Sequence, residues 1–172
     1  MSYYYSYGLP VTIVRPFNIF GPRQSMRAVI PTIINQAITN KNKINLGTIK
    51  SKRDYTFVAD TVKAFEKCIN NKKAIGEIIN IGNNFEISIK EIVQFISKIS
   101  KKKIEINIDK KRLRPKKSEV MRLRSSNNLS KNLLKWKPVY GGKNGFKKAL
   151  QKTFQWYEKN KNNSLNVSKY TI

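Results

Sequence analysis

The chain has 172 residues, of which 40% are hydrophobic and 26% are charged, and its formal net charge at pH 7 is +25. This length supports one domain with a core, and the composition excludes a disordered chain. No apolar run approaches the roughly 20 residues that a membrane-spanning helix needs, and the N-terminus lacks the layout of a signal peptide, so a cytoplasmic protein is expected.

The elements expected along the chain alternate between helices and strands. The first is a short tyrosine-rich helix that ends at Gly8. A β-branched strand follows from Val11 and must stop near Arg15, because Pro16 cannot donate to a sheet. Further helices are expected over residues 30–40, 58–69, 88–100, 128–134 and 146–159, and further strands over 44–46, 77–81 and 103–108. This alternation indicates an α/β fold.

Some of these segments carry sharper predictions. Ser88 and Glu91 are spaced as a capping box. The single cysteine, Cys68, lies in an apolar helical pattern, and because the chain has no histidine to activate it we expect a reduced core thiol. Trp136 is expected to be a core anchor, and residues 112–124 a polar loop. In the helix over 58–69, four apolar residues recur at helical spacing and predict a buried stripe: Val58, Val62, Phe65 and Ile69.

The large positive charge raises the hypothesis of a nucleic-acid-binding protein. Lysine supplies most of the excess, and the lysines are scattered over the expected helix faces. The densest basic segments, residues 101–103 and 110–117, contain no aromatic residues on which bases could stack. A solvated lysine-rich surface is therefore the favoured interpretation, and nucleic-acid binding is a minor alternative.

Arginine stands at several of the positions that could carry chemistry. Its planar guanidinium suits bidentate binding of phosphate, whereas ordinary surface ion pairing is the alternative for any one arginine. In open α/β sheets, ligands bind beyond the carboxyl ends of the strands, so the loop after the first strand is expected to form the mouth of a site. The candidate segments are residues 15–18 with 21–23, residues 52–55, residues 112–115 and residues 136–138.

Several motifs, taken in order along the chain, resemble those of one family. They are RPFNIFGPRQ from Arg15, GxxxxxRDYTFVADTVKAF from Gly47, INIG from Ile79, SIKEIVQFI from Ser88, LRP from Leu113 and LLKWKP from Leu133. Together they resemble the extended short-chain dehydrogenase/reductase family of NAD-dependent sugar-nucleotide epimerases and dehydratases. Within it, the chain is most similar to the nucleotide-activated N-acetylglucosamine 4,6-dehydratases of the legionaminic-acid type.

The resemblance implies an architecture and a set of ligands. Residues 1–160 would form the C-terminal part of an extended Rossmann-type fold, with its last parallel strands and a small α/β substrate-binding subdomain, and residues 161–172 a flexible tail. The implied cofactor is NAD and the implied substrate is a nucleotide-diphosphate sugar, with no metal. Whether the nucleotide is UDP or GDP, and whether the reaction is dehydration or epimerisation, stays open.

The resemblance also implies roles for particular residues. Pro16 would lie near the nicotinamide of NAD, and Asn18 would bind the sugar nucleotide near its phosphates. Arg53 and Arg114 would clamp the diphosphate, and Arg27 would lie along the nucleotide base. The segment Leu133 to Pro138 matches the LGWxP end motif of the family, except that Lys135 replaces the glycine.

Two motifs of the family do not occur where they are expected, which leaves the N-terminal dinucleotide-binding half missing. No GxxGxxG turn follows a strand, and no Tyr-x-x-x-Lys pair stands in its expected place. The one literal match, Tyr157 to Lys161, lies in a lysine-rich terminal helix and is attributed to chance. No catalytic residue is therefore assigned.

The leading hypothesis is the sugar-nucleotide-binding half of an NAD-dependent 4,6-dehydratase or epimerase, inactive alone. A non-catalytic nucleotide-sugar-binding module is the alternative. Because a parallel sheet is normally buried on both faces, we expect poor solubility alone or pairing with a separately encoded N-terminal half. Members of the family are often homodimers, so a second copy is another expected partner.

Overall fold

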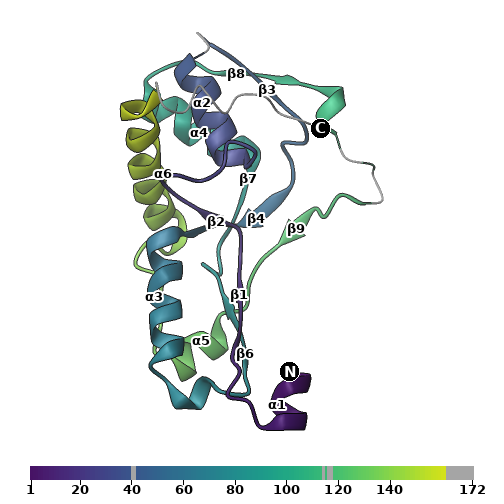
Figure 1. Ribbon diagram of the computed structural model, residues 1–172. Helices are drawn as coiled ribbons and strands as arrows, with labels where there is room; N and C mark the ends of the chain where they lie inside the picture. Colours follow the sequence, from purple (N-terminus) through teal and green to yellow (C-terminus); the bar gives the residue numbers. More distant parts are fainter. Residues whose placement is uncertain (40–41, 114, 116–117, 162–172) are drawn as a thin grey trace. The chain divides into compact units, whose positions relative to one another are not determined.

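The computed structural model describes residues 1–39, 42–113, 115 and 118–161 (Figure 1). These residues divide into two compact units. Unit 1 comprises Met1–Ile19, Arg53–Glu86 and Leu123–Phe146, and unit 2 comprises Phe20–Lys52, Ile87–Arg122 and the described part of Lys147–Ile172. Within the described ranges, no helix is both long enough and apolar enough to cross a bilayer.

Unit 1 is built on two parallel strands. β1 (Ile13–Pro16) pairs with β6 (Ile78–Ile81), with Ile13 opposite Ile78 and Pro16 opposite Ile81. The helical elements of this unit are α1 (Ser2–Tyr7), α3 (Val58–Ile69), the 3₁₀ turn η1 (Lys72–Ala74) and α5 (Asn128–Leu133). One core cluster joins α3, β6 and the end of α5: Ala64, Cys68, Ala74, Ile79, Ile81, Leu134 and Trp136. Cys68 and Trp136 are both buried there, as the sequence predicts.

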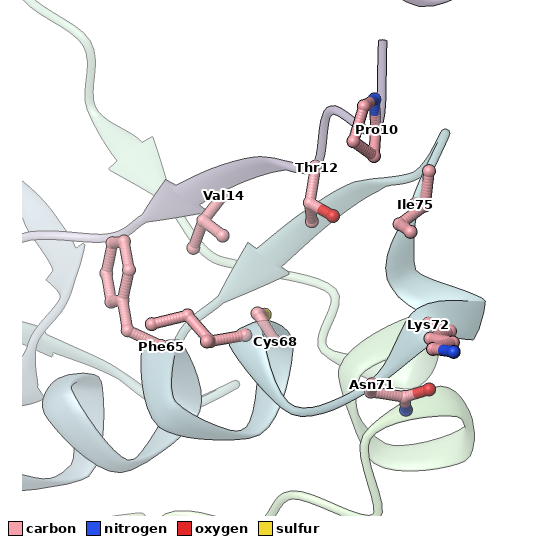
Figure 2. Close-up of a pocket in the computed structure, with 9 residues that line it drawn as sticks. Pro10, Thr12, Val14, Phe65, Cys68, Asn71, Lys72 and Ile75 are labelled. Carbon is pink, nitrogen blue, oxygen red and sulfur yellow. The ribbon is translucent and has the colours of Figure 1, made fainter. Parts of the chain in front are cut away.

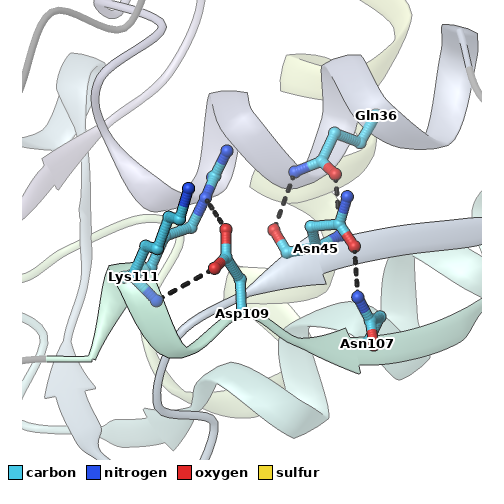
Figure 3. Close-up of polar contacts among 6 residues, drawn as sticks. Gln36, Asn45, Asn107, Asp109 and Lys111 are labelled. Atoms are coloured by element: carbon cyan, nitrogen blue, oxygen red, sulfur yellow. Dashed lines mark hydrogen bonds and ion pairs between the residues drawn. The ribbon is translucent and has the colours of Figure 1, made fainter.

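Unit 2 repeats the same design on a second pair of strands. β3 (Lys43–Leu46) and β8 (Glu105–Ile108) are parallel, and α2 (Val29–Thr39) packs against β3 and against α4 (Ile89–Ser100). The 3₁₀ turn η2 (Lys110–Arg112) follows β8. The side chain of Gln36 donates to the carbonyl of Asn45 and accepts from its amide, while Asn107 donates to the Asn45 side chain (Figure 3). These bonds satisfy polar groups of β3 that would otherwise rely on water.

The remaining strands form two further small sheets. β2 (Ile19–Phe20) pairs with β5 (Thr56–Phe57), and β4 (Lys52–Asp54) lies between β7 (Glu86–Ser88) and β9 (Arg122–Leu123). The division between units falls inside β2, β4, β7, β9 and α6 (Gly142–Lys159).

Most of the predicted elements are confirmed. The α/β class holds, and the helices expected over 30–40, 58–69 and 88–100 are observed as α2, α3 and α4, with bounds within one residue. The capping box is present, because the Ser88 hydroxyl accepts from the Glu91 amide at 3.2 Å and the Glu91 carboxylate accepts from the Ser88 amide at 3.0 Å. Gly8 ends α1 in the left-handed conformation, with φ of 65°. The expected tail lies outside the described residues from 162 onward.

The prediction for the apolar stripe of α3 was wrong. Val62, Phe65 and Ile69 are 51%, 41% and 83% exposed. The face that packs on the sheet instead carries Ala64 and Cys68, whose small side chains let the helix approach β6 closely. Periodicity identified an apolar face of α3, but the helix has two such faces and only the other one is covered by its own unit.

In the segment predicted as a polar loop, residues 112–124, the described part includes two short regular pieces. It begins in the last residue of η2 and contains strand β9. A two-residue strand of Arg122 and Leu123 has no hydrophobic alternation, so the sequence carries no signal for it.

The LGWxP motif of the family has a glycine where this chain has Lys135, and the backbone conformation at this position favours glycine. Lys135 is exposed and adopts a φ of 49°, in the left-handed region that favours glycine. We therefore expect Lys135→Gly to raise the free energy of unfolding by about 0.5–1 kcal/mol, measured by urea denaturation.

The matched control is Lys131→Gly, an exposed lysine inside α5. There glycine is expected to lower stability by about 0.5–1 kcal/mol, because it adds backbone entropy to the unfolded chain. Equal destabilisation at both positions would show that the backbone of Lys135 is not strained.

Candidate functional site

The candidate site lies in unit 1, where β1 and β6 end. Because the two strands are parallel, their carboxyl ends meet at one edge, and the amide of Phe17 donates to the carbonyl of Ile81 at 2.8 Å just beyond β1. Asn18 follows β1 directly, and Asn83 follows Gly82 at the end of β6. This is the edge at which open α/β sheets bind ligands.

A buried carboxylate organises this edge. Asp54, the last residue of β4, has no exposed surface. One of its oxygens accepts from the amide of Asn83 at 2.8 Å, and the other accepts from the amide of Ser125 at 3.1 Å and from its hydroxyl at 2.6 Å. Buried charge is tolerated only when it is well hydrogen-bonded, and this arrangement supplies three bonds. Asp54 thereby ties β4 to the segments that follow β6 and β9.

The same strand fixes the side chain of Asn18. The Asn18 amide nitrogen Nδ2 donates to the carbonyl of Asp54 at 2.9 Å, and the Asn18 carbonyl accepts from the amide of Thr56 at 3.1 Å. One side-chain hydrogen is used in this way, which leaves the carboxamide oxygen and the second N–H for a ligand. The side chain itself is exposed at the end of β1.

Arg53 precedes Asp54 and is half-buried. Since successive residues of a strand point to opposite faces, the guanidinium of Arg53 lies on the face of β4 opposite the Asp54 carboxylate. Tyr55 is buried beyond it, and burial raises the pKa of the Tyr55 phenol to about 12, although the positive charge of Arg53 acts in the opposite direction. Tyr55 therefore stays neutral at pH 7, and Arg53 is the positively charged residue of this motif.

Gly82 allows the network around Asp54 to close. A Cβ atom at this position would lie 2.1 Å from the Ser125 hydroxyl oxygen and 2.4 Å from the Ser125 Cβ, so any side chain would displace Ser125. Ser125 also accepts from the amide of Asn84 at 3.1 Å, and the Arg124 Nε donates to the Asn84 side chain at 2.9 Å. The glycine of the INIG motif thus has a packing role.

The structure brings three of the five predicted site residues into one unit. Pro16, Asn18 and Arg53 all belong to unit 1, at or near the end of β1 and in β4. Arg27 is exposed and belongs to unit 2, where its amide donates to the Ser25 hydroxyl before α2. Arg114 lies outside the described residues.

Sequence reasoning missed the residues that position this site. Asn83 carries the same signal as Asn18, a polar residue just after an apolar strand, and Asp54 lies inside the RDY motif. Ser125 carried no signal, because it lies 71 residues from Asp54 and in no recognisable pattern.

The literal Tyr-x-x-x-Lys match has a structural role at its tyrosine. Tyr157 is buried on α6, and its hydroxyl donates to the carbonyl of Gln24. Burial raises the pKa of Tyr157 to about 12, which suits a packing residue more than an acid or base at neutral pH.

Comparison with known proteins shows the family of this chain. Residues 1–149 match the family model described as GDP-mannose 4,6 dehydratase. This chain belongs to that family. The relatives are dTDP-glucose 4,6-dehydratases and related NAD-dependent epimerases and dehydratases, which confirms the extended short-chain dehydrogenase/reductase resemblance.

Individual relatives show how much of their length the chain spans. It is 34% identical over 173 aligned positions to the mouse dTDP-D-glucose 4,6-dehydratase, covering 98% of this chain and 46% of that protein. A solved dTDP-glucose 4,6-dehydratase from Bacillus anthracis, in complex with NAD, superposes with a TM-score of 0.82 at 30% identity, covering 97% of this chain and 50% of that one.

A third relative was solved with both kinds of ligand. The UDP-glucuronic acid 4-epimerase from Bacillus cereus, in complex with UDP-glucuronic acid and NAD, has a TM-score of 0.79 at 25% identity, covering 92% of this chain and 48% of that one. The chain therefore spans about half the length of these relatives, in keeping with the C-terminal part of a Rossmann-type enzyme fold.

Proposed function

We propose that this chain supplies the nucleotide-sugar-binding half of an NAD-dependent nucleotide-sugar 4,6-dehydratase or epimerase. The observation that carries the proposal is the set of bonds around Asp54: its carbonyl accepts from the Asn18 side chain, and its buried carboxylate accepts from Asn83 and Ser125 at the ends of β6 and β9. Arg53 is the neighbouring residue of Asp54 in β4. A carboxamide held in place and an arginine on the same strand as Asp54 suit a ligand that carries phosphate.

In this proposal each residue has a binding role. The guanidinium of Arg53 pairs with oxygens of the diphosphate, together with Arg114, and Asn18 donates to the same region. Pro16 borders the nicotinamide of NAD, and Arg27 lies along the base of the nucleotide. The support is that family members have been solved with UDP-glucuronic acid or with NAD bound. The subtype, an N-acetylglucosamine 4,6-dehydratase of the legionaminic-acid type, stays a prediction.

The chemistry of the reaction depends on groups that this sequence does not supply. Bound NAD would supply hydride transfer from the sugar and back to it. The present residues hold the sugar nucleotide in position, and no acid or base for the sugar carbons is assigned among them. We therefore propose that the chain gives no turnover by itself with NAD and a nucleotide sugar. Measurable dehydratase activity of the purified chain would contradict this part of the proposal.

Calorimetry with UDP-, GDP- and dTDP-sugars tests the binding role. We expect Arg53→Ala to weaken binding about 10- to 100-fold, because a charge-assisted hydrogen bond contributes about 1.5–3 kcal/mol. The control is Lys63→Ala, which removes the same charge from an exposed position on α3 and should leave the affinity within about 2-fold. Equal losses for the two variants would show that binding reflects net charge alone.

A further inference from the structure

The loop of residues 21–28, which joins β2 to α2 in unit 2, begins with a tight turn. The amide of Gln24 donates to the carbonyl of Gly21 at 3.4 Å, so Pro22 and Arg23 are the central residues of this turn. Arg23 has a φ of 64°, in the left-handed region where a turn with proline at its second position usually has glycine at its third. A non-glycine residue keeps such a conformation only where its surroundings enforce it, and such positions gather at functional sites.

Tyr157 on α6 holds this turn in place. It also belongs to unit 2, and its hydroxyl donates to the carbonyl of Gln24, 133 positions earlier in the sequence. The side chain is 3% exposed, and the ring of Trp156 packs edge-on against it with the ring centroids 4.9 Å apart. Because burial raises the pKa of the Tyr157 phenol to about 12, the hydroxyl keeps its donor proton at neutral pH.

The other end of the 21–28 loop is bonded to α2. The Thr32 hydroxyl lies 2.8 Å from the carbonyl oxygens of both Met26 and Ala28. The amide of Ala28 donates to the carbonyl of Ser25 at 3.0 Å. Arg27 lies between these anchored residues, with its side chain exposed. The loop is therefore held at both ends and presents Arg27 from a fixed backbone.

We infer that Tyr157 is a positioning residue for the nucleotide base, acting through the Gln24 carbonyl to keep the 21–28 loop in place so that Arg27 stacks on the base. The inference rests on the proposed function, which assigns Arg27 to the base. A guanidinium is planar and stacks on aromatic rings. A loop that is already ordered loses less conformational entropy when its ligand binds, so the bond to Tyr157 favours binding of the base.

Amide hydrogen exchange of Tyr157→Phe, which removes the hydroxyl and retains the ring, tests the anchor. The matched control is Thr153→Val, which removes a buried hydroxyl one turn earlier on α6, where it donates to the carbonyl of Ala149 and not to the loop. We expect the amides of Gln24 and Ala28 to exchange at least 10-fold faster in Tyr157→Phe and within about 2-fold of the original rate in Thr153→Val. Unchanged exchange in Tyr157→Phe would overturn the inference.

Calorimetry of the full chain with UDP, GDP, dTDP and inorganic pyrophosphate separates the base from the diphosphate. Tyr157→Phe should weaken the tightest of the three nucleoside diphosphates about 5- to 10-fold, the effect of one lost hydrogen bond, and leave pyrophosphate within about 2-fold. In an Arg27→Ala background, Tyr157→Phe should have little further effect, because the hydroxyl acts through Arg27. Thr153→Val should leave all four affinities within about 2-fold.

Cys68 reports whether Tyr157→Phe loosens the chain as a whole. It lies in unit 1, where it lines a pocket of about 500 Å³ between α3 and β1 (Figure 2). It is the single cysteine, so alkylation by iodoacetamide reads its accessibility directly. The alkylation rate should stay within about 2-fold in Tyr157→Phe. A larger increase would overturn the inference, because the variant would then act through general unfolding.

The affinities distinguish failure of this inference from failure of the proposed function. If Arg53→Ala weakened the nucleoside diphosphates while Tyr157→Phe left them unchanged, or weakened pyrophosphate equally, the role of Tyr157 would be wrong and the binding role of the chain would stand. If Arg53→Ala left every affinity unchanged, the proposed function would fail. Absence of binding to all three nucleoside diphosphates would overturn both.

Discussion

Asp54→Ala is expected to lower the free energy of unfolding by about 3–5 kcal/mol. The variant leaves the amides of Asn83 and Ser125 buried without the carboxylate that accepts from them. Urea denaturation followed by circular dichroism measures the change. Asp54→Asn keeps the shape but turns one acceptor into a donor, and a loss of about 2 kcal/mol is expected.

The control for Asp54 is an aspartate that makes comparable bonds at the surface. Asp109 accepts from the amide of Lys111 and from the guanidinium of Arg112 (Figure 3). Its side chain is 30% exposed, so Asp109→Ala should cost no more than about 1 kcal/mol. If the two alanine variants lost equal stability, the Asp54 network would not be the organising feature of the site.

Trp136→Ala is expected to lower stability by about 3–5 kcal/mol, as for other buried aromatic residues. The side chain is 2% exposed in the core cluster of unit 1, and its indole nitrogen donates to the carbonyl of Asp60 at 3.1 Å. Trp136→Phe retains most of the volume and loses the hydrogen bond, so a smaller loss of about 1–2 kcal/mol is expected. Urea denaturation measures both variants.

An exposed position provides the control for Trp136. Val139 is 67% exposed in the same segment, and Val139→Ala should change stability by less than about 0.5 kcal/mol. A loss at Trp136 as small as that at Val139 would mean that the C-terminal motif does not anchor unit 1.

Much of the fold could be predicted from local signals. β-branched runs marked β1 and β6, periodicity marked α2 and α4, and the spacing of Ser88 and Glu91 marked the start of α4. These signals are local because a helix cap or an apolar face is encoded within a few residues. The exposed stripe of α3 was misjudged because periodicity shows that a face is apolar and does not show what covers it.

The site could be predicted only in part, because the residues that form it lie far apart in the sequence. Asn18 and Arg53 stood out through residue type and position, but the partners that hold Asp54 lie 29 and 71 residues away. No local pattern reports such pairings. The sequence therefore did not show that Asp54, which is bonded to Asn18 and adjoins Arg53, is buried and organises the site. Long-range hydrogen bonds of this kind are decided by the packed fold.

Nuclear magnetic resonance of the arginine and asparagine side chains gives the most direct test of nucleotide-sugar binding. In a ¹⁵N-labelled sample titrated with UDP-, GDP- and dTDP-glucose in turn, the Arg53 Nε–H and the Asn18 Nδ2–H₂ signals should shift together with at least one of the three ligands. Both signals should lose their response in Asp54→Asn if the fold is retained. Shifts confined to surface lysines, or no shift at Arg53 and Asn18 with any of the three, would contradict the proposed function.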